Sequence, residues 1–345
     1  MNLPAILAGP FTGASKLFTI AFALVVALVL GVSLLITLAV QSAGAQASST
    51  CTGKHVYPTQ NLTTVAANSP KGTTFCIHDG TYNISVPVRV EGTDRFIGLY
   101  NDSTRPAVVT SKAQQVFNAG PSSGALIKGL KISGAVGGNY CEPNCGRGIQ
   151  GGKNLTVRNA WITNNKNSGI GGTSTGLRVE NSRIDHNGSY SFSYLDGQPS
   201  TAAGIKSSQS GLTVVNSTIT DNYWDGVWCD NDCEAVTVKG STLTGNGKSG
   251  IHAEILSGPA VFSGNTIKGN GRLNGANHPS GLLIVSSSNV DAYNNTFGNN
   301  YEHGVRIIKD GRAPGVSNVK IHDNTMSGDT LSGCTLSGVS CQSNN

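Results

Sequence analysis

The sequence predicts an all-β solenoid, a stack of short coils in which strands alternate with tight turns. Two observations carry this prediction: a composition rich in turn-forming residues and one pattern that recurs along the chain. Of 345 residues, 45 are glycine and 32 are asparagine, whereas charged residues make up only 12%. A coiled coil would be rich in Ala, Glu, Lys and Leu, and collagen needs glycine at every third position, so both classes are excluded.

The N-terminal segment, residues 1–45, predicts export of the rest of the chain. An uncharged apolar stretch covers 17–40, with Lys16 before it and a small-residue A-x-A site at 43–45. This layout is typical of a secretory signal peptide, but the stretch is also long enough to be an uncleaved membrane anchor. Both alternatives put the body of the chain outside the cytoplasm, secreted or held by one N-terminal transmembrane helix.

The overall charge argues against a nucleic-acid partner. The net charge is +5, and the sequence has no run of Lys and Arg and no basic stripe with interleaved aromatic residues. Contact with a membrane is expected only through the N-terminal segment, residues 1–45.

Eight cysteines after an export signal predict a disulfide framework. The simplest pairing joins neighbours along the chain: Cys51–Cys76, Cys141–Cys145, Cys229–Cys233 and Cys334–Cys341. The alternative is a zinc site built from the two C-x3-C pairs. Those pairs fall on different repeats, which is too far apart for one metal ion, so we favour disulfides.

Residues 46–125 are expected to form an N-terminal cap and the first coils, with one disulfide tying the cap down. Residues 126–330 carry the repeat. Its units share an apolar anchor, an Asn three residues later and, in the coils without insertions, a Gly four residues after that; uninterrupted coils are 22 to 24 residues long. The anchors are Ile162, Ile184, Ile219, Leu243, Ile267, Phe297 and Met326, and the second column is Asn165, Asn187, Asn222, Asn246, Asn270, Asn300 and Asp329. Residues 331–345 are a Ser/Gly-rich tail that closes the far end.

Each repeat is too short to bury its own apolar face, so the copies must stack. We expect the Asn column to occupy left-handed turn positions and to bond from coil to coil. We expect the Gly column, which includes Gly169, Gly226, Gly250 and Gly304, to supply positive φ angles at the bends. On these repeats the chain resembles the right-handed parallel β-helix proteins of the pectate-lyase-like superfold. That resemblance implies a fold and no particular activity.

The strands that begin at the glycines carry the candidate site. Because side chains alternate along a strand, the second and fourth residues after each glycine face outward. The second positions include Lys206, Trp228, His252 and Arg306, and the fourth include Ser208, Asp230 and Glu254. Two neighbouring carboxylates among cations and aromatic rings, in a chain so poor in charge, predict a functional face.

Three insertions are expected to wall a groove along this face, at 136–147, 188–203 and 271–280. Aromatic side chains near them are candidate platforms for sugar rings. These expected substrate-binding residues are Tyr190, Tyr194, Tyr223, Trp224 and Trp228, together with the cations Lys206 and Arg306.

The two carboxylates suggest chemistry on a polysaccharide. A separation of about 5 Å, one coil, is close to that of retaining glycosidases, and such proximity should raise the pKa of one carboxyl group. Glycoside hydrolysis would use Glu254 as acid/base, Asp230 as nucleophile or base and His252 as a further catalytic group. No cofactor is required for that reaction.

Two alternatives stay open. A polysaccharide lyase or epimerase would bind Ca²⁺ through Asp230, Asp232 and Glu254 and use Lys206 or Arg306 as base. A non-enzymatic surface protein would only bind carbohydrate or build structure.

Sequence motifs do not decide between these alternatives. The pair G-V-W-x-D at 226–230 and G-I-H-x-E at 250–254 looks like a pair that recurs in secreted bacterial β-helix proteins. The segment 304–309 is similar to the R-I-K segment of polygalacturonases but has an extra Ile, and the other motifs of that family do not appear in order.

Overall fold

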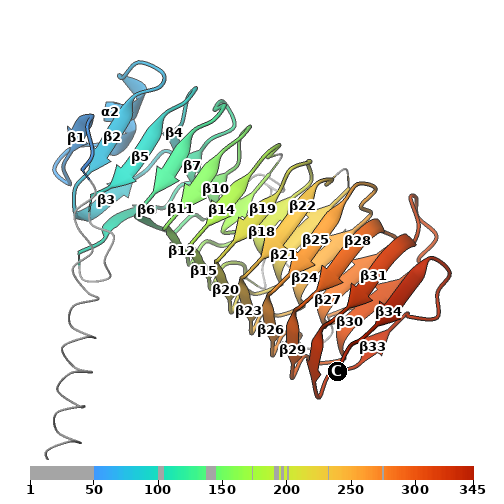
Figure 1. Cartoon of the computed structure of the whole chain (residues 1–345). Coiled ribbons are helices and arrows are strands. Elements are labelled where there is room, and N and C mark those ends of the chain that lie inside the picture. Colours follow the sequence, from blue (N-terminus) through green and yellow to red (C-terminus); the bar gives the residue numbers. More distant parts are fainter. Residues whose placement is uncertain are drawn as a thin grey trace, which may run out of the picture. The chain divides into compact units, whose positions relative to one another are not determined.

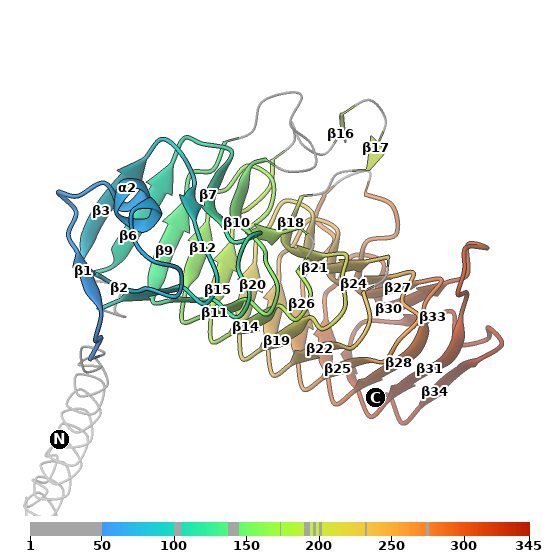
Figure 2. The same ribbon diagram turned by 90° about the horizontal axis from the view of Figure 1, so that it is seen from above.

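The computed structural model describes residues 50–99, 105–136, 145–172, 174–189, 194–195, 198–199, 202–231, 233–273 and 276–345. Their strands form three parallel sheets that stack coil upon coil, as Figures 1 and 2 show from two directions. No helix in these ranges is both long and apolar enough to cross a membrane. The segment 17–40 lies outside the described residues.

Each complete coil contributes one strand to each sheet, so strands that pair are neighbours in coil order. Among the described residues, sheet A has twelve strands: β1 (Lys54–Val56), β2 (Thr74–Ile77), β5 (Arg95–Gly98), β8 (Leu126–Lys128), β11 (Thr156–Arg158), β14 (Arg178–Glu180), β19 (Thr213–Val215), β22 (Val236–Lys239), β25 (Ala260–Ser263), β28 (Ser288–Tyr293), β31 (Ser317–His322) and β34 (Val339–Gln342).

Sheets B and C each have ten strands within the described ranges. Sheet B contains β3 (Gly80–Ile84), β6 (Ala107–Ser111), β9 (Leu130–Ser133), β12 (Trp161–Thr163), β15 (Arg183–Asp185), β20 (Thr218–Thr220), β23 (Thr242–Thr244), β26 (Thr266–Lys268), β29 (Thr296–Gly298) and β32 (Thr325–Ser327). Sheet C contains β4 (Val88–Arg89), β7 (Gln115–Asn118), β10 (Arg147–Gln150), β13 (Ile170–Gly171), β18 (Ala203–Ser207), β21 (Asp225–Asp230), β24 (Ser249–Glu254), β27 (Ser280–Val285), β30 (His303–Ile308) and β33 (Leu331–Ser332). A separate antiparallel pair joins β16 (Tyr194–Leu195) to β17 (Gln198–Pro199).

The predicted repeat register is confirmed in sheet B. The apolar anchors pair in sequence order, with Ile219 between Ile184 and Leu243. In β20 the flanking Thr218 is exposed and Ile219 is buried, which is the alternation that a half-buried strand requires. Together with buried side chains of the other two sheets, these anchors form one continuous apolar core. Burying each such side chain contributes roughly 1.5–3 kcal/mol, so the stack as a whole supplies the stability that one coil lacks.

The two ends of the stack differ. At the N-terminal end a short helix, α2 (Leu62–Ala67), buries Leu62 and Ala66 in the core and contacts β3 and β4. Figure 2 shows α2 beside β3. Its N-cap is Asn61, whose side chain accepts a hydrogen bond from the Thr64 backbone N–H at 3.0 Å. At the other end, the segment expected as a tail adds β33 and β34 to sheets C and A.

The asparagine column bonds from coil to coil as expected. Asn222 Nδ2 donates to Asn246 Oδ1 at 3.0 Å, and Asn246 Nδ2 donates to Asn270 Oδ1 at 3.0 Å. The expected left-handed geometry, however, falls one residue earlier. Asp221, not Asn222, has a φ of 54°. The column Asn must turn its amide inward to bridge two coils, and the preceding residue makes the bend.

The expectation for the glycine column was wrong. The column glycines, at the start of the sheet C strands, have no positive φ. They are required because the next coil approaches too closely for a side chain. A Cβ on Gly226 would lie 2.6 Å from the carbonyl oxygen of Gly250 and 2.8 Å from Asn246 Nδ2. Glycine thus allows the corner of each coil to pack against the next, rather than permitting an unusual backbone conformation.

Three expected disulfides are confirmed: Cys51–Cys76, Cys229–Cys233 and Cys334–Cys341. Cys145 is also disulfide-bonded, and its expected partner, Cys141, lies outside the described residues. These bonds rule out a zinc site built from the C-x3-C pairs, and they are typical of extracytoplasmic proteins.

Candidate functional site

The two outward-facing columns predicted on sheet C are present. Trp228 on β21 pairs with Lys206 on one side and His252 on the other, and Asp230 pairs with Glu254. The columns continue through Leu283 to Arg306 and through Val285 to Ile308. Beyond Glu254 the fourth-position column is therefore apolar, and the carboxylates are confined to two coils. Ser208 lies just beyond the end of β18.

A cleft of about 440 Å³ opens over these two coils. Its floor is the outward face of β18, β21, β24 and β27, and the segments after β26 and β30 contribute side chains to its walls. The lining residues are Lys206, Trp228, Asp230, Asn231, Lys248, His252, Glu254, Asn277, His278, Leu283, Val285, Ile308, Asp310 and Arg312. The expected role of the 271–280 insertion as a wall is thus seen in Asn277 and His278.

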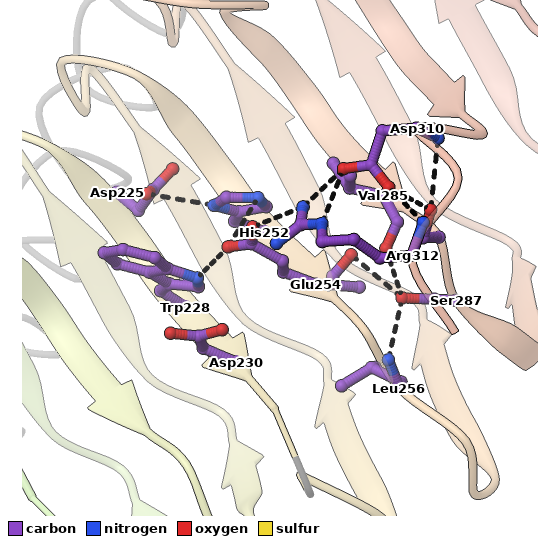
Figure 3. A network of polar contacts seen from close by, with 12 residues as sticks. Asp225, Trp228, Asp230, His252, Glu254, Leu256, Val285, Ser287, Asp310 and Arg312 are labelled. Atoms are coloured by element: carbon purple, nitrogen blue, oxygen red, sulfur yellow. Dashed lines mark hydrogen bonds and ion pairs between the residues drawn. The ribbon is translucent and has the colours of Figure 1, made fainter. Parts of the chain in front are cut away.

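The two carboxylates of the cleft have different partners. Asp230 Oδ2 lies 3.2 Å from Lys206 Nζ. Glu254 Oε2 accepts a hydrogen bond from Trp228 Nε1 at 3.0 Å, and Glu254 Oε1 accepts one from Arg312 Nη2 at 2.8 Å (Figure 3). The side chains of Asp230 and Glu254 are 17% and 15% exposed, so each keeps some contact with the space of the cleft.

Charge decides the ionisation of Glu254. Burial acts to raise its pKa, but His252, Arg312 and Lys248 outweigh that effect and hold the pKa below its ordinary value. Two close carboxylates were expected to raise the pKa of one of them; the pKa of Glu254 moves in the opposite direction, because its carboxylate faces His252 and Arg312.

At the floor of the cleft lies a buried triad, Asp225, Lys248 and His252, of which the sequence predicted only His252. His252 Nδ1 lies 3.3 Å from Asp225 Oδ2 and 3.3 Å from Lys248 Nζ. Its other ring nitrogen, Nε2, lies 3.6 Å from Glu254 Oε2 (Figure 3). Asp225 is fully buried; burial would raise its pKa, but Lys248 and His252 hold the pKa below the ordinary value.

Trp228 and Trp224 are buried, contrary to the expectation of exposed platforms for sugar rings. The Trp228 indole lies between Lys206 Nζ, 3.3 Å from the ring centroid, and the His252 ring, stacked at 5.3 Å. Trp224 packs with Trp228 and Ala202 in a small apolar cluster. Trp228 therefore lines the cleft only with the small part of its surface that stays exposed, and Trp224 is not among the lining residues.

The remaining predicted residues are dispersed. Arg306 does not line the cleft and pairs with Glu302. Tyr223 is half-buried and also absent from the lining. Tyr190 and the side chain of Tyr194 lie outside what the structure describes, so their expected contribution to sugar binding stays a prediction.

Lys206 is held in an unusual environment. Burial lowers the pKa of its ammonium group, and the Asp230 carboxylate opposes that shift without cancelling it. A lysine of this kind is easier to deprotonate than an exposed one, as the lyase alternative requires.

A calcium ion does not fit the described carboxylates well. Among the described residues, no three His, Cys, Asp or Glu side chains are grouped to hold a metal, and Asp232 lies outside them. Calcium would need the carboxylate oxygens of Asp230 and Glu254 as ligands. Asp230 already faces Lys206 at 3.2 Å, and Glu254 already faces Arg312 at 2.8 Å.

Residues 115–275 and 201–345 match a protein family described as the right handed beta helix region. These matches together span more than half of the chain. The chain belongs to this family.

Solved structures with a similar β-helix share the fold at low identity. Pectate lyase Pel9A has a TM-score of 0.55 at 17% identity, over 86% of this chain and 80% of that chain. A double mutant of the periplasmic alginate epimerase AlgG has a TM-score of 0.50 at 16% identity, over 84% of each chain. No curated protein matches the sequence. At these identities the likeness shows the pectate-lyase-like β-helix fold and does not identify a reaction.

Proposed function

We propose that this β-helix protein hydrolyses glycosidic bonds of a polysaccharide, with Asp230 and Glu254 as its catalytic pair. The observation that carries the proposal is the register of β21 and β24, which makes these residues direct neighbours in the cleft. Enzymes that act on polysaccharides are also found among the proteins with a similar fold, including a pectate lyase and an alginate epimerase.

The spacing favours retention of configuration at the sugar. Neighbouring strands lie about 4.8 Å apart, and retaining glycosidases hold their two carboxyl groups about 5–5.5 Å apart. Asp230 would attack the anomeric carbon while Glu254 gives a proton to the departing oxygen. Water then attacks the glycosyl–Asp230 ester, returns a proton to Glu254 and releases the sugar.

The charges of the cleft favour a neutral sugar over a uronate. Each described cation in the lining already has a carboxylate partner: Lys206 with Asp230, Arg312 with Glu254, and Lys248 with Asp225. The carboxylate of a uronate would enter a cleft without an unpaired lysine or arginine among these residues. Elimination chemistry, which needs that carboxylate neutralised, is therefore the weaker alternative.

The same proposal includes the place of action. Disulfides and the apolar segment 17–40 support a protein that is secreted or held at the membrane by that segment, and that meets its polysaccharide outside the cytoplasm.

The purified chain should be incubated with a panel of neutral and acidic polysaccharides. We expect new reducing ends on at least one neutral glycan, and a loss of about 1,000-fold or more in rate for Asp230→Ala and Glu254→Ala. Glu302→Gln is the matched control, because Glu302 pairs with Arg306 and does not line the cleft.

Other outcomes would overturn the proposal. Unsaturated uronate products that require Ca²⁺ would indicate a lyase. Binding of a glycan without any cleavage would indicate a non-enzymatic surface protein, and full activity in both alanine variants would remove the carboxylate pair from the mechanism.

A further inference from the structure

The buried triad is not explained by the needs of the fold. On the strands beside β21, the position equivalent to Asp225 is occupied by Ala203 and Ser249, and further along sheet C by Ser280 and His303. The β-helix therefore does not require a carboxylate at this place. Burying a carboxylate and an ammonium group costs free energy, which indicates a role in the chemistry above them.

The geometry of His252 defines what that role can be. Asp225 Oδ2 and Lys248 Nζ lie at the same distance, 3.3 Å, from Nδ1. When Nδ1 carries a proton, it donates to Asp225, and Nε2 becomes the nitrogen that can gain or lose a proton. That nitrogen is buried, has no hydrogen-bond partner among the described residues, and points toward Glu254 Oε2 at 3.6 Å.

We propose that His252, held by Asp225, is the proton reservoir of Glu254. This inference rests on the proposed glycoside hydrolysis. The proposed cycle begins with the shared proton on His252 Nε2 and with Glu254 as a carboxylate. Transfer of that proton from Nε2 to Oε2 produces a neutral imidazole and the carboxylic acid that protonates the departing oxygen. In the second half of the reaction, the proton that water gives up restores the pair, so the cycle balances.

This arrangement explains how an ionised Glu254 can serve as an acid. The groups facing His252 are Asp225 on β21, with Lys248 just before β24 and Glu254 at its end; Arg312 and His278 face the same cleft from the neighbouring segments. The gap of 3.6 Å is longer than a hydrogen bond, and catalytic contacts of this kind commonly shorten when substrate binds. Because His252 acts through Glu254, it is a positioning residue.

The test compares leaving groups. On an aryl glycoside with a poor leaving group, such as a phenyl glycoside, His252→Asn and Asp225→Asn should each lower kcat by about 100-fold. On the 2,4-dinitrophenyl glycoside, whose departure needs no proton, both variants should stay within about threefold of wild type. The alkaline limb of the phenyl glycoside's pH profile should also move to lower pH in His252→Asn, because Glu254 then depends on its own proton.

His303→Gln is the control: His303 lies on β30 of the same sheet and does not line the cleft. If His252→Asn and Asp225→Asn lowered kcat equally on the phenyl and 2,4-dinitrophenyl glycosides, or on neither, the proposal that His252 is the proton reservoir of Glu254 would be overturned. If the wild-type protein cleaved no glycoside in any panel, the proposed hydrolysis itself would fail. That result is distinguishable from failure of the proton reservoir, in which the wild-type protein is active. Asp225→Asn preserves the shape of its side chain, so it tests the inference even if His252→Asn does not fold.

Discussion

At the scale of single residues, the cleft is a set of compensated charges. Lys206 and Asp230 form one pair, and Arg312 bridges Glu254 and Asp310. The guanidinium of Arg312 is itself oriented by Asp310, whose side chain accepts from Arg312 Nε at 2.7 Å. Arg312 is 45% exposed, so it is the partner of Glu254 that substrate and solvent can most easily reach.

Replacing Arg312 should therefore change the ionisation of Glu254. A neighbouring cation lowers the pKa of a carboxyl group, so Arg312→Gln should raise the pKa of Glu254. Since the proposed hydrolysis needs Glu254 as an acid, the alkaline limb of kcat/KM should move to higher pH, with less than about a tenfold change in the maximum. Arg306→Gln is the control, because Arg306 pairs with Glu302 rather than with Glu254, and it should leave the alkaline limb of kcat/KM unmoved. A shift of that limb to lower pH in Arg312→Gln would contradict the role given to Arg312.

Sequence reasoning could find only some of these residues. Lys206, Trp228, His252, Asp230 and Glu254 follow from the repeat and the alternation of a strand. Arg312 does not, because it belongs to a segment 58 residues beyond Glu254 that follows a later coil. Its nearness depends on how that segment folds back over two coils, which no periodicity encodes.

The triad was missed for a different reason. Asp225 and Lys248 precede the column glycines Gly226 and Gly250, at positions where the repeat has no recognisable column. The one available signal was a pair of charged residues in a chain otherwise poor in charge, next to positions held by Ala203 and Ser280. The burial of Trp224 and Trp228 could not be read from the pattern either, because it depends on Lys206, His252 and the 271–280 segment covering the rings.

At the scale of elements, the corner glycines determine how closely β21 and β24 pack. Gly226→Ala should lower the free energy of unfolding by about 1–3 kcal/mol, because its Cβ would meet the Gly250 carbonyl oxygen at 2.6 Å and force the strands apart. Urea unfolding measures this change. The same shift would alter the pairing of Asp230 with Glu254, so activity should fall as well.

Gly298→Ala provides the matched control for that substitution. A Cβ at Gly298 on β29 would meet its nearest neighbours at ordinary distances of 3.4–3.5 Å, and Gly298 has no positive φ. Its stability should stay within about 0.5 kcal/mol of wild type. Equal effects of the two substitutions would contradict the close-approach explanation of the glycine column.

At this scale the sequence predicted the ladder of Asn222, Asn246 and Asn270 correctly but not its conformation. The backbone N–H and the side-chain amide of a column Asn both donate to the column Asn of the next coil, as Asn222 does to Asn246. The residue immediately before the column Asn, such as Asp221, makes the bend with a positive φ. A second ladder, through Asn265, Asn295 and Asn324, was not predicted at all. On earlier coils the same column is occupied by serines such as Ser217 and Ser241. Because the residue type changes along the column, the sequence shows no continuous row of Asn there.

At the scale of the whole molecule, the β-helix is a rigid support for a small reactive region. The described coils share one core, and along the described part of sheet C two adjacent coils combine outward carboxylates, cations and a buried charged triad. The family provides the support; the proposed activity depends on the departures from its repeat. The proposed function therefore depends on the pairing of Asp230 with Glu254 in the cleft rather than on the fold.

Trapping the covalent intermediate tests that claim most directly. A panel of activated 2-deoxy-2-fluoro glycosides should inactivate the wild-type protein with one added sugar per chain, and mass spectrometry of its peptides should find that sugar esterified to Asp230. Asp230→Asn should not be labelled. A sugar attached to another residue, or turnover of the parent glycosides with inversion and no labelling, would contradict the assignment.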